Sequence, residues 1–295
     1  MRWSVRPCLD SNAGPAVGTA TSWKGGSELA GLAAGGLAES PGRESPTAPV
    51  TSRCLVLVPA RSERGRLSRV VDGVLDTLDA DVLVLDAGAN DFSASGFSER
   101  VVSIRVPQGV GSAVRKGLEY AVSHGYDVVT RIDGDGQHSP TILRDILARH
   151  RADADMVVGS RYHPLSPVIS APPTDRIALN VMFRSVVKQL CGLAMTDVIS
   201  GCWAMNRSTM EFVAPRIQVK EYGSTLEILL LLGLARRFSV HEVPHPAIYA
   251  GHGIEARYTE AQLTHRCDRA GVYLKVVADV MNRHGVDAWP LLIQR

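Results

Sequence analysis

The chain has 295 residues, 45% of them hydrophobic and 21% charged, which is enough apolar surface for one large or two small domains and excludes a wholly disordered protein. Its 32 basic and 30 acidic side chains leave a formal charge of +2. This balance argues against a nucleic-acid binder and favours a small-molecule substrate. The five cysteines form no CxxC pair, which argues against a zinc site or a disulfide framework and predicts reduced thiols in a cytoplasm.

The first 52 residues are dense in Gly, Ser, Ala, Pro and Thr, and such a composition predicts a flexible leader. The segment nearest to a signal-peptide core, Leu29–Ala38, is interrupted by glycines and follows no basic cluster. The longest uncharged apolar run, Ile228–Ala235, is far shorter than the roughly 20 residues that cross a bilayer. We therefore expect no transmembrane segment, while peripheral contact with a membrane stays open.

Beyond the leader, short apolar runs alternate with helical patterns, which predicts an α/β fold with a mostly parallel sheet flanked by helices and ligands at the carboxyl ends of the strands. Strands are expected at 54–59, 82–86, 101–106, 128–132, 156–159, 200–205 and 240–244. Helices are expected at 67–78, 112–124, from Ser139 to 150, and at 176–190, 226–235 and 259–284, with Gly125 ending the second. This pattern divides the chain into a leader (1–52), one α/β domain (53–258) and a C-terminal helical extension (259–295).

The most informative segment is Asp133-Gly-Asp-Gly-Gln137, directly after a predicted strand. In an extended backbone, Asp133, Asp135 and Gln137 project to the same side. Two carboxylates and an amide oxygen suit Mg²⁺ or Mn²⁺, which leave positions open for the phosphates of a nucleotide. A solvated Asp/Gly turn is the alternative. An EF-hand is excluded because its twelfth position is Arg144 rather than Glu, while an aspartyl phosphatase remains a minor alternative.

A glycine turn precedes the second predicted helix. Gly109 and Gly111 lack the third glycine of a dinucleotide motif, because Val114 occupies that position. Tight packing is the simpler interpretation of Gly109. Gly111 and Arg115 could still border a phosphate at the start of the helix.

Taken together and in order, six segments resemble the motifs of the family 2 inverting glycosyltransferases, in particular the dolichol-phosphate mannosyltransferase branch. The resemblance covers about residues 54–250, and the ordered set is more specific than any one motif. The segments are Pro59–Glu63, Leu85–Asp91, Gly109–Gly117, Asp133–Gln137, Val158–Tyr162 and Asp197–Gly201.

The resemblance implies a GT-A fold, a nucleotide-sugar donor and a divalent metal. By the same resemblance, Pro59, Ala60 and Glu63 hold the nucleoside, and Asp86 faces the base or ribose. Arg161 and Arg176 are placed around a donor or acceptor phosphate, a role that suits a guanidinium. The metal and diphosphate segment is Asp133, Asp135 and Gln137.

The implied reaction is a single displacement at the anomeric carbon with inversion, in which a metal neutralises the departing diphosphate. Asp135 is the central catalytic residue of this interpretation. A hydroxyl acceptor needs a general base, and the resemblance offers Asp197 for it, although a turn or capping role is an equal alternative. A phosphate acceptor, already ionised, needs no base.

Several positions depart from the family pattern. Ala87 replaces the second acid of a paired motif, and Ser62 replaces the usual asparagine, so the base of the donor stays open between GDP and UDP. Two cations of the mannosyltransferase branch are missing near Ala250 and Glu255-Ala256. Their loss weakens the case for a lipid phosphate and favours a soluble metabolite as acceptor, although both stay open, with His252 as a candidate substitute for a lost cation.

We expect a metal-dependent hexosyltransferase in the cytoplasm, possibly at the membrane surface. The alternative from another class is a sugar-nucleotide-binding protein without turnover. His241 and His245 have the spacing of a helical metal site, but they fall on a predicted strand, so packed or solvated side chains are the expected interpretation.

Overall fold

The computed structural model describes residues 52–61, 63, 65–88, 92–170, 172–246, 248–249 and 260–286, with the side chains of 152 and 260–267 excepted. All of these belong to one compact unit, residues 50–295. The predicted leader lies outside the described residues, apart from residue 52. So do several positions that depart from the family pattern, namely Ser62, Ala250, His252, Glu255 and Ala256.

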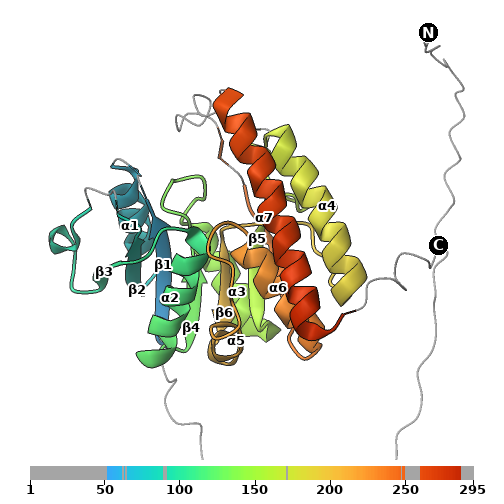
Figure 1. Ribbon diagram of the computed structural model, residues 1–295. Helices are drawn as coiled ribbons and strands as arrows, with labels where there is room; N and C mark the ends of the chain where they lie inside the picture. The colour runs from blue at the N-terminus through green and yellow to red at the C-terminus, as the bar shows by residue number, and fades with distance from the viewer. Residues whose placement is uncertain are drawn as a thin grey trace, which may run out of the picture. The chain divides into compact units, whose positions relative to one another are not determined.

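A seven-stranded sheet forms the centre of this unit (Figure 1), in the order β3-β2-β1-β4-β6-β5-β7. The predicted, mostly parallel sheet is confirmed, and among the described strands only β6 runs antiparallel to its neighbours, β4 and β5. The strands are β1 (Cys54–Ala60), β2 (Asp81–Asp86), β3 (Val101–Arg105), β4 (Val128–Arg131), β5 (Met156–Ser160), β6 (Trp203–Asn206) and β7 (Val240–Pro244).

Seven helices accompany the described strands, and one of them, α5, is absent from the sequence-based expectation. They are α1 (Arg66–Thr77), α2 (Val110–Ser123), α3 (Ile142–Asp153), α4 (Thr174–Cys191), α5 (Arg207–Val213), α6 (Ser224–Ala235) and α7 (Glu260–His284), with a 3₁₀ turn at Ala94–Gly96. The start predicted for α3 at Ser139 is wrong by three residues. Ser139 instead accepts the backbone N–H of Ile142 in a turn, and its hydroxyl pairs with Thr141.

Two hydrophobic cores lie on the two faces of the sheet, because successive side chains of a strand point in opposite directions. In β1, Leu55 and Leu57 belong to the core beneath α2, α4, α5, α6 and α7, whereas Val56 and Val58 belong to the core beneath α1 and α3. Burial on both faces explains why β1 is a continuous apolar run rather than an alternating one.

Helix α6 is enclosed on all sides and carries a buried carboxylate. Glu227 is 1% exposed and accepts the backbone N–H groups of Gln218 and Val219 at 2.9–3.1 Å. Arg283 of α7 donates to the same carboxylate at 2.5 Å. The ion pair therefore ties α7 to α6 and to the loop that precedes α6. No helix in the described part of the chain has the length and apolar character needed to cross a bilayer.

Replacing Glu227 with alanine tests this anchor. The variant leaves Arg283 and two backbone N–H groups without their acceptor, so the free energy of unfolding should fall by about 3 kcal/mol in urea titrations. The matched control is Glu211→Ala, which breaks a solvent-exposed pair with Arg207 and should cost less than about 1 kcal/mol. Equal losses in the two variants would contradict the anchoring role.

Candidate active site

A cavity of about 400 Å³ opens where strands β1, β4 and β5 end at their carboxyl termini. Its walls come from segments that lie far apart in the sequence. They are Glu63 after β1, residues 131–138 around the end of β4, Arg161 after β5, Arg176 at the start of α4, residues 199–201 and 222–226, and two side chains of α7. A parallel sheet gathers such strand ends at one edge, which is where the sequence placed the site.

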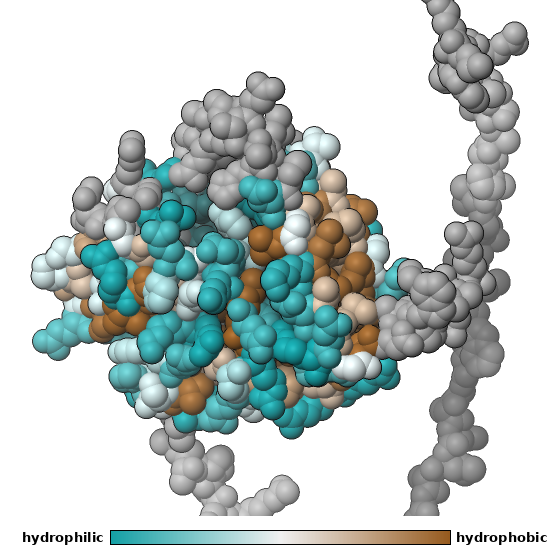
Figure 2. Space-filling view, viewed as in Figure 1, coloured by the Kyte–Doolittle hydropathy of each residue, from teal (hydrophilic) through white to brown (hydrophobic). Residues whose placement is uncertain are grey.

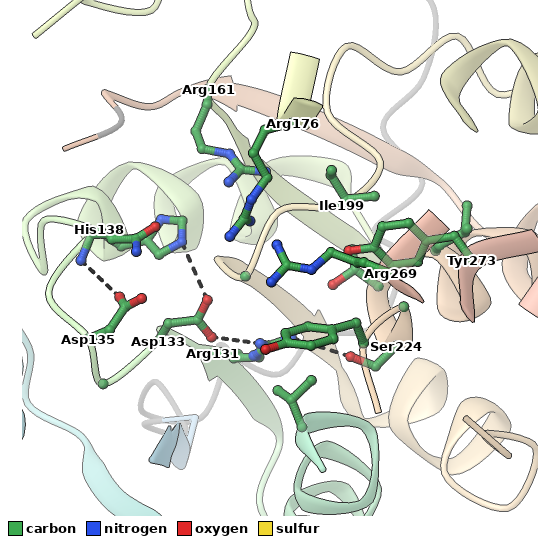
Figure 3. Close-up of a pocket in the computed structure, with 18 of the residues that line it drawn as sticks. Arg131, Asp133, Asp135, His138, Arg161, Arg176, Ile199, Ser224, Arg269 and Tyr273 are labelled. Carbon is green, nitrogen blue, oxygen red and sulfur yellow. Dashed lines mark hydrogen bonds and ion pairs between the residues drawn. The ribbon is translucent and has the colours of Figure 1, made fainter. Parts of the chain in front are cut away.

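The segment after β4 brings its carboxylates into this cavity. Asp133, Asp135 and Gln137 all line it, but residues 134–136 form a turn with Gly136 at a φ of 78° rather than the extended backbone that the spacing argument assumed. Asp133 accepts a bond of 2.6 Å from the Arg131 guanidinium through Oδ1, and its Oδ2 lies 3.7 Å from Nε2 of His138 (Figure 3). Asp135 accepts the backbone N–H of Gln137 at 3.0 Å, so both carboxylates have fixed directions.

The two carboxylates differ in their electrostatic surroundings. Burial alone would raise the pKa of Asp133, but Arg131 and His138 outweigh it and hold that pKa well below its usual range. Burial, followed by the negative charge of Asp133, raises the pKa of Asp135. Asp135 therefore loses its proton less readily than Asp133. A bound cation would offset the repulsion between the two negative charges and so stabilise both carboxylates in the ionised form. The hard oxygen donors of Asp133, Asp135 and Gln137 suit Mg²⁺ or Mn²⁺.

Gly201 gives the Asp133 carboxylate its space. A Cβ atom at this position would overlap the carboxylate oxygens of Asp133. The neighbouring backbone is fixed, because Thr225 donates to the carbonyl of Ser200, whose hydroxyl donates to the carbonyl of Gly159. The glycine in the Asp197–Gly201 segment is therefore required by the direct approach of a charged side chain.

Arg161 enters the cavity from the end of β5 and is held by a buried carboxylate. Its Nε and Nη2 donate to the two oxygens of Asp197 at 2.7 and 3.0 Å. Asp197 is 0% exposed and is not among the lining residues. Because both oxygens of Asp197 accept bonds from Arg161 and the residue lies outside the cavity lining, the geometry favours an orienting role over the general base suggested for Asp197. Asp197 orients Arg161 instead.

Two further arginines lack such a partner. Arg176 at the start of α4 and Arg269 on α7 both line the cavity, and no carboxylate of the described residues pairs with either. Figure 3 shows both guanidinium groups directed into the same space. Burial, and then the charge of Arg176, lowers the pKa of Arg269. Two like charges in a shared cavity predict an anionic ligand between them, since a phosphate would neutralise both.

The sequence analysis missed four of the residues that shape the site. Tyr273 and Arg269 lie on α7, where the apolar stripe predicted only a docking face. The contact of Arg131 with Asp133 could have been predicted, because Arg131 precedes Asp133 by two residues in an extended segment and therefore projects to the same side. His138 follows the metal-binding motif directly, but nothing in the sequence indicated that it would face Asp133.

The predicted donor-binding residues are distributed unevenly. Glu63 lines the cavity. Pro59 and Ala60 end β1 beside it, where the carbonyl of Pro59 accepts the N–H of Gly134 at 3.3 Å. Asp86 ends β2, accepts the N–H of Gly88 and pairs with Arg105, outside the cavity lining.

The expectation that Gly111 and Arg115 border a phosphate disagrees with their positions. Gly111 packs against the carbonyls of Val219 and Glu221, and its N–H donates to the latter. Arg115 pairs with Glu119 on the surface of α2. Neither residue lines the cavity, although Val110 at the start of the same helix does.

A comparison with protein families decides the assignment. The profile "Glycosyl transferase family 2" matches residues 55–213, which is more than half of the chain. The chain belongs to glycosyltransferase family 2. The match includes the strands β1 to β6 and the acidic residues of the cavity, but it ends before α6 and α7.

Curated relatives show the same family affiliation. The chain is 28% identical to a polyprenol monophosphomannose synthase from Mycolicibacterium smegmatis over 69% of this chain and 80% of that protein. It is 24% identical to a UDP-N-acetylglucosamine–dolichyl-phosphate N-acetylglucosaminyltransferase from Methanococcus voltae, over 70% and 90%. An undecaprenyl-phosphate mannosyltransferase from Micrococcus luteus is 28% identical over 60% and 76%. This glycosyltransferase thus resembles the branch that the sequence motifs indicated.

Solved structures support the fold. The chain is similar to a glucosyl-3-phosphoglycerate synthase from Mycobacterium tuberculosis, solved with Mn²⁺, UDP and phosphoglyceric acid, with a TM-score of 0.55 over 80% of both chains and 18% identity. The same enzyme with Mn²⁺ and UDP-glucose gives a TM-score of 0.54 over 80% of both chains and 19% identity. At these identities the likeness confirms the predicted GT-A fold of the glycosyltransferase.

Gly201→Ala tests the close approach at Asp133. The added methyl group should displace the carboxylate, and a shift of about 1 Å can lower turnover on the order of 100-fold. We expect a large fall in kcat with a melting temperature near that of the wild type. Gly271→Ala is the control, because a Cβ there meets no atom within 4 Å. A fully active Gly201→Ala enzyme would show that Asp133 does not need its observed position.

Proposed function

We propose that this protein transfers a hexose, with inversion, from a nucleotide diphosphate sugar to a polyprenyl phosphate, with the help of a divalent cation. One observation carries the proposal, namely that a single cavity holds an acidic pair, Asp133 and Asp135, and two arginines, Arg176 and Arg269, that pair with no carboxylate of the described residues. The acidic pair suits the cation and diphosphate of a donor. The arginines suit the phosphate of an acceptor.

The donor end of the site follows from its oxygen ligands. Asp133, Asp135 and Gln137 would hold Mg²⁺ or Mn²⁺, which would neutralise negative charge on the departing nucleoside diphosphate. Arg131 and His138 fix the direction of the Asp133 carboxylate. Glu63 lines the same cavity at the end of β1, where the family resemblance places the nucleoside of a GDP- or UDP-sugar.

The acceptor end favours an ionised nucleophile. Arg161 is held by Asp197, and Arg176 and Arg269 stand near it without carboxylates of their own. A phosphate placed between these guanidinium groups would already carry the negative charge that attacks the anomeric carbon, so it needs no general base. This agrees with the position of Asp197, which is buried, bound to Arg161 and outside the cavity lining.

Exposed apolar side chains next to the arginines favour a lipid acceptor. Leu165, Val168 and Ile169, which lie between Arg161 and Arg176 in the chain, are 75%, 86% and 60% exposed, and Val181 on α4 is 48% exposed. Figure 2 shows a brown area on the side of the molecule where Figure 1 places α4. Such side chains beside a phosphate site suit a polyprenyl chain or a membrane surface.

The names of the curated relatives support the same acceptor, since three of them refer to polyprenol, dolichyl phosphate or undecaprenyl phosphate. We extend this acceptor class to the present glycosyltransferase as part of the proposal. It would act at the membrane surface through peripheral contact. A cytoplasmic location remains a prediction.

Asp135→Asn tests the cation site. The substitution keeps the size of the side chain but removes one of the charges that would hold the cation, so kcat should fall by at least about 100-fold. Thermal unfolding should remain near that of the wild type, because the side chain belongs to neither core. Asp145→Asn, on the exposed side of α3, is the control. Wild-type turnover in Asp135→Asn would remove this residue from the mechanism.

Arg269→Ala tests the acceptor end. Loss of a charged donor to phosphate should raise the KM for polyprenyl phosphate by about 10- to 100-fold and change the KM for the nucleotide sugar much less. Steady-state assays with each substrate varied in turn separate the two effects. Arg184→Ala, exposed on α4, should leave both values unchanged. Equal increases in both KM values would argue against a separate acceptor role.

The class of acceptor is decided by incubating the protein with Mn²⁺, GDP- or UDP-hexoses and a panel of acceptors. Release of the nucleoside diphosphate with polyprenyl phosphate, and formation of a glycolipid, is the expected result. Transfer only to soluble phosphorylated compounds would refute the lipid acceptor. Binding of donor without transfer or hydrolysis across the panel would support the sugar-nucleotide-binding alternative.

A further inference from the structure

Two buried histidines from distant parts of the chain contact each other, and one of them, His138, lines the cavity. His138 is 3% exposed and His245 is 0% exposed, and Nδ1 of His138 lies 2.5 Å from Nε2 of His245. The ring centroids are 4.8 Å apart with planes inclined by 22°. Because the two nitrogens are 2.5 Å apart while the ring centres are 4.8 Å apart, each nitrogen points toward the other ring. The rings therefore contact edge to edge rather than face to face. The geometry is that of a hydrogen bond in the plane of the rings.

The fold places His245 at this point through the end of β7. Pro244 pairs with Ser160 of β5, and the backbone N–H of His245 continues the ladder by donating to the carbonyl of Ser160 at 2.9 Å. His241, earlier on the same strand, instead contacts Arg149.

Cys202 is a third soft donor nearby, and His138, Cys202 and His245 offer ligand atoms within 4.8 Å of one another. A metal ion does not fit the observed geometry. Two histidine nitrogens on one tetrahedral zinc ion lie about 3.3 Å apart, given Zn–N bonds near 2.0 Å, whereas these nitrogens are 2.5 Å apart. Burial also raises the pKa of the Cys202 thiol, with Asp133 adding to the effect. A shared proton explains the contact better.

The direction of this hydrogen bond follows from its surroundings. Burial, with help from His138 and Arg161, lowers the pKa of His245 to about 2, so His245 is neutral and carries one N–H group. Its Nδ1 atom has no hydrogen-bond partner among the described residues. A buried N–H without a partner is rarer than a buried lone pair without one. The N–H of His245 is therefore on Nε2 and is donated to Nδ1 of His138.

The consequence reaches the active site. With Nδ1 of His138 accepting a bond, the N–H of His138 is on Nε2, the atom that faces Oδ2 of Asp133 at 3.7 Å. The opposite tautomer would direct a lone pair at a carboxylate, which is repulsive. The hydrogen bond at one ring nitrogen of a histidine thus decides whether the other nitrogen is a donor or an acceptor.

We propose that His245 is a positioning residue for the cation site. By fixing the orientation and tautomer of His138, it holds the Asp133 carboxylate in the direction that a divalent cation requires. The proposal rests on the metal-dependent function proposed above. It concerns the affinity for the cation rather than the binding of the sugar or the acceptor.

The test measures Mn²⁺ binding directly, by electron paramagnetic resonance of free Mn²⁺ during titration of the full-length protein. His245→Phe keeps a planar ring but removes both nitrogens, and it should weaken Mn²⁺ binding by about 3- to 10-fold, less than the 10- to 100-fold typical when a direct partner of a metal ligand is lost. His245→Gln restores a polar group at this position and should recover most of the affinity. His241→Phe, on the same strand, should bind Mn²⁺ like the wild type.

Four results would overturn the proposal. Unchanged Mn²⁺ affinity in a folded His245→Phe protein would show that His138 needs no partner. Equal losses in the Phe and Gln variants would point to packing alone. Stoichiometric zinc in the purified protein, lost in Cys202→Ser, would make the histidines ligands. If the wild type itself bound no Mn²⁺, the metal-dependent function would fail, and this inference would fail with it.

Discussion

The site depends on keeping two carboxylates side by side at the end of β4. Their mutual repulsion must be offset, and the fold does this at Asp133 with a guanidinium from Arg131 and an imidazole from His138. Gly201, from a distant segment, supplies the space. Arg131 and His138 belong to the same segment as Asp133, so it is Gly201 that makes the observed position of the carboxylate depend on the folded protein. The cation proposed for the site would neutralise the remaining negative charge of Asp133 and Asp135.

The cavity has an acidic part and a basic part of different origin. The acidic part lies on loops that follow strands of the sheet, within the region that the family profile matches. Much of the basic part depends on helices, and Arg269 and Tyr273 of α7 lie beyond that region. Arg161 and Arg176, with the start of α4, still lie within the matched region, so among the basic side chains of the cavity only Arg269 of α7 lies beyond it.

Buried polar groups connect these parts to the fold. Asp197 holds Arg161, and its own N–H is held by Glu242 of β7. Glu227 ties α7 to α6, which keeps Arg269 over the cavity. In both cases a buried carboxylate is satisfied by several donors, as its desolvation requires. These acids act by placing arginines, and a conserved-looking motif position such as Asp197 can therefore serve the site without facing the substrate.

The sequence by itself determined the sheet-and-helix alternation, the position of the acidic pair at a strand end and the family, because these follow from local periodicity and from the spacing of side chains on one strand. It could not reveal that Asp197 is enclosed, that Arg115 lies outside the cavity, or that Arg269 and His245 join the site. Those facts depend on which distant segments pack together. Only the tertiary structure brings the end of β7 to His138 and α7 to the cavity. Local sequence patterns do not indicate which charged groups from distant segments will become the neighbours of a side chain.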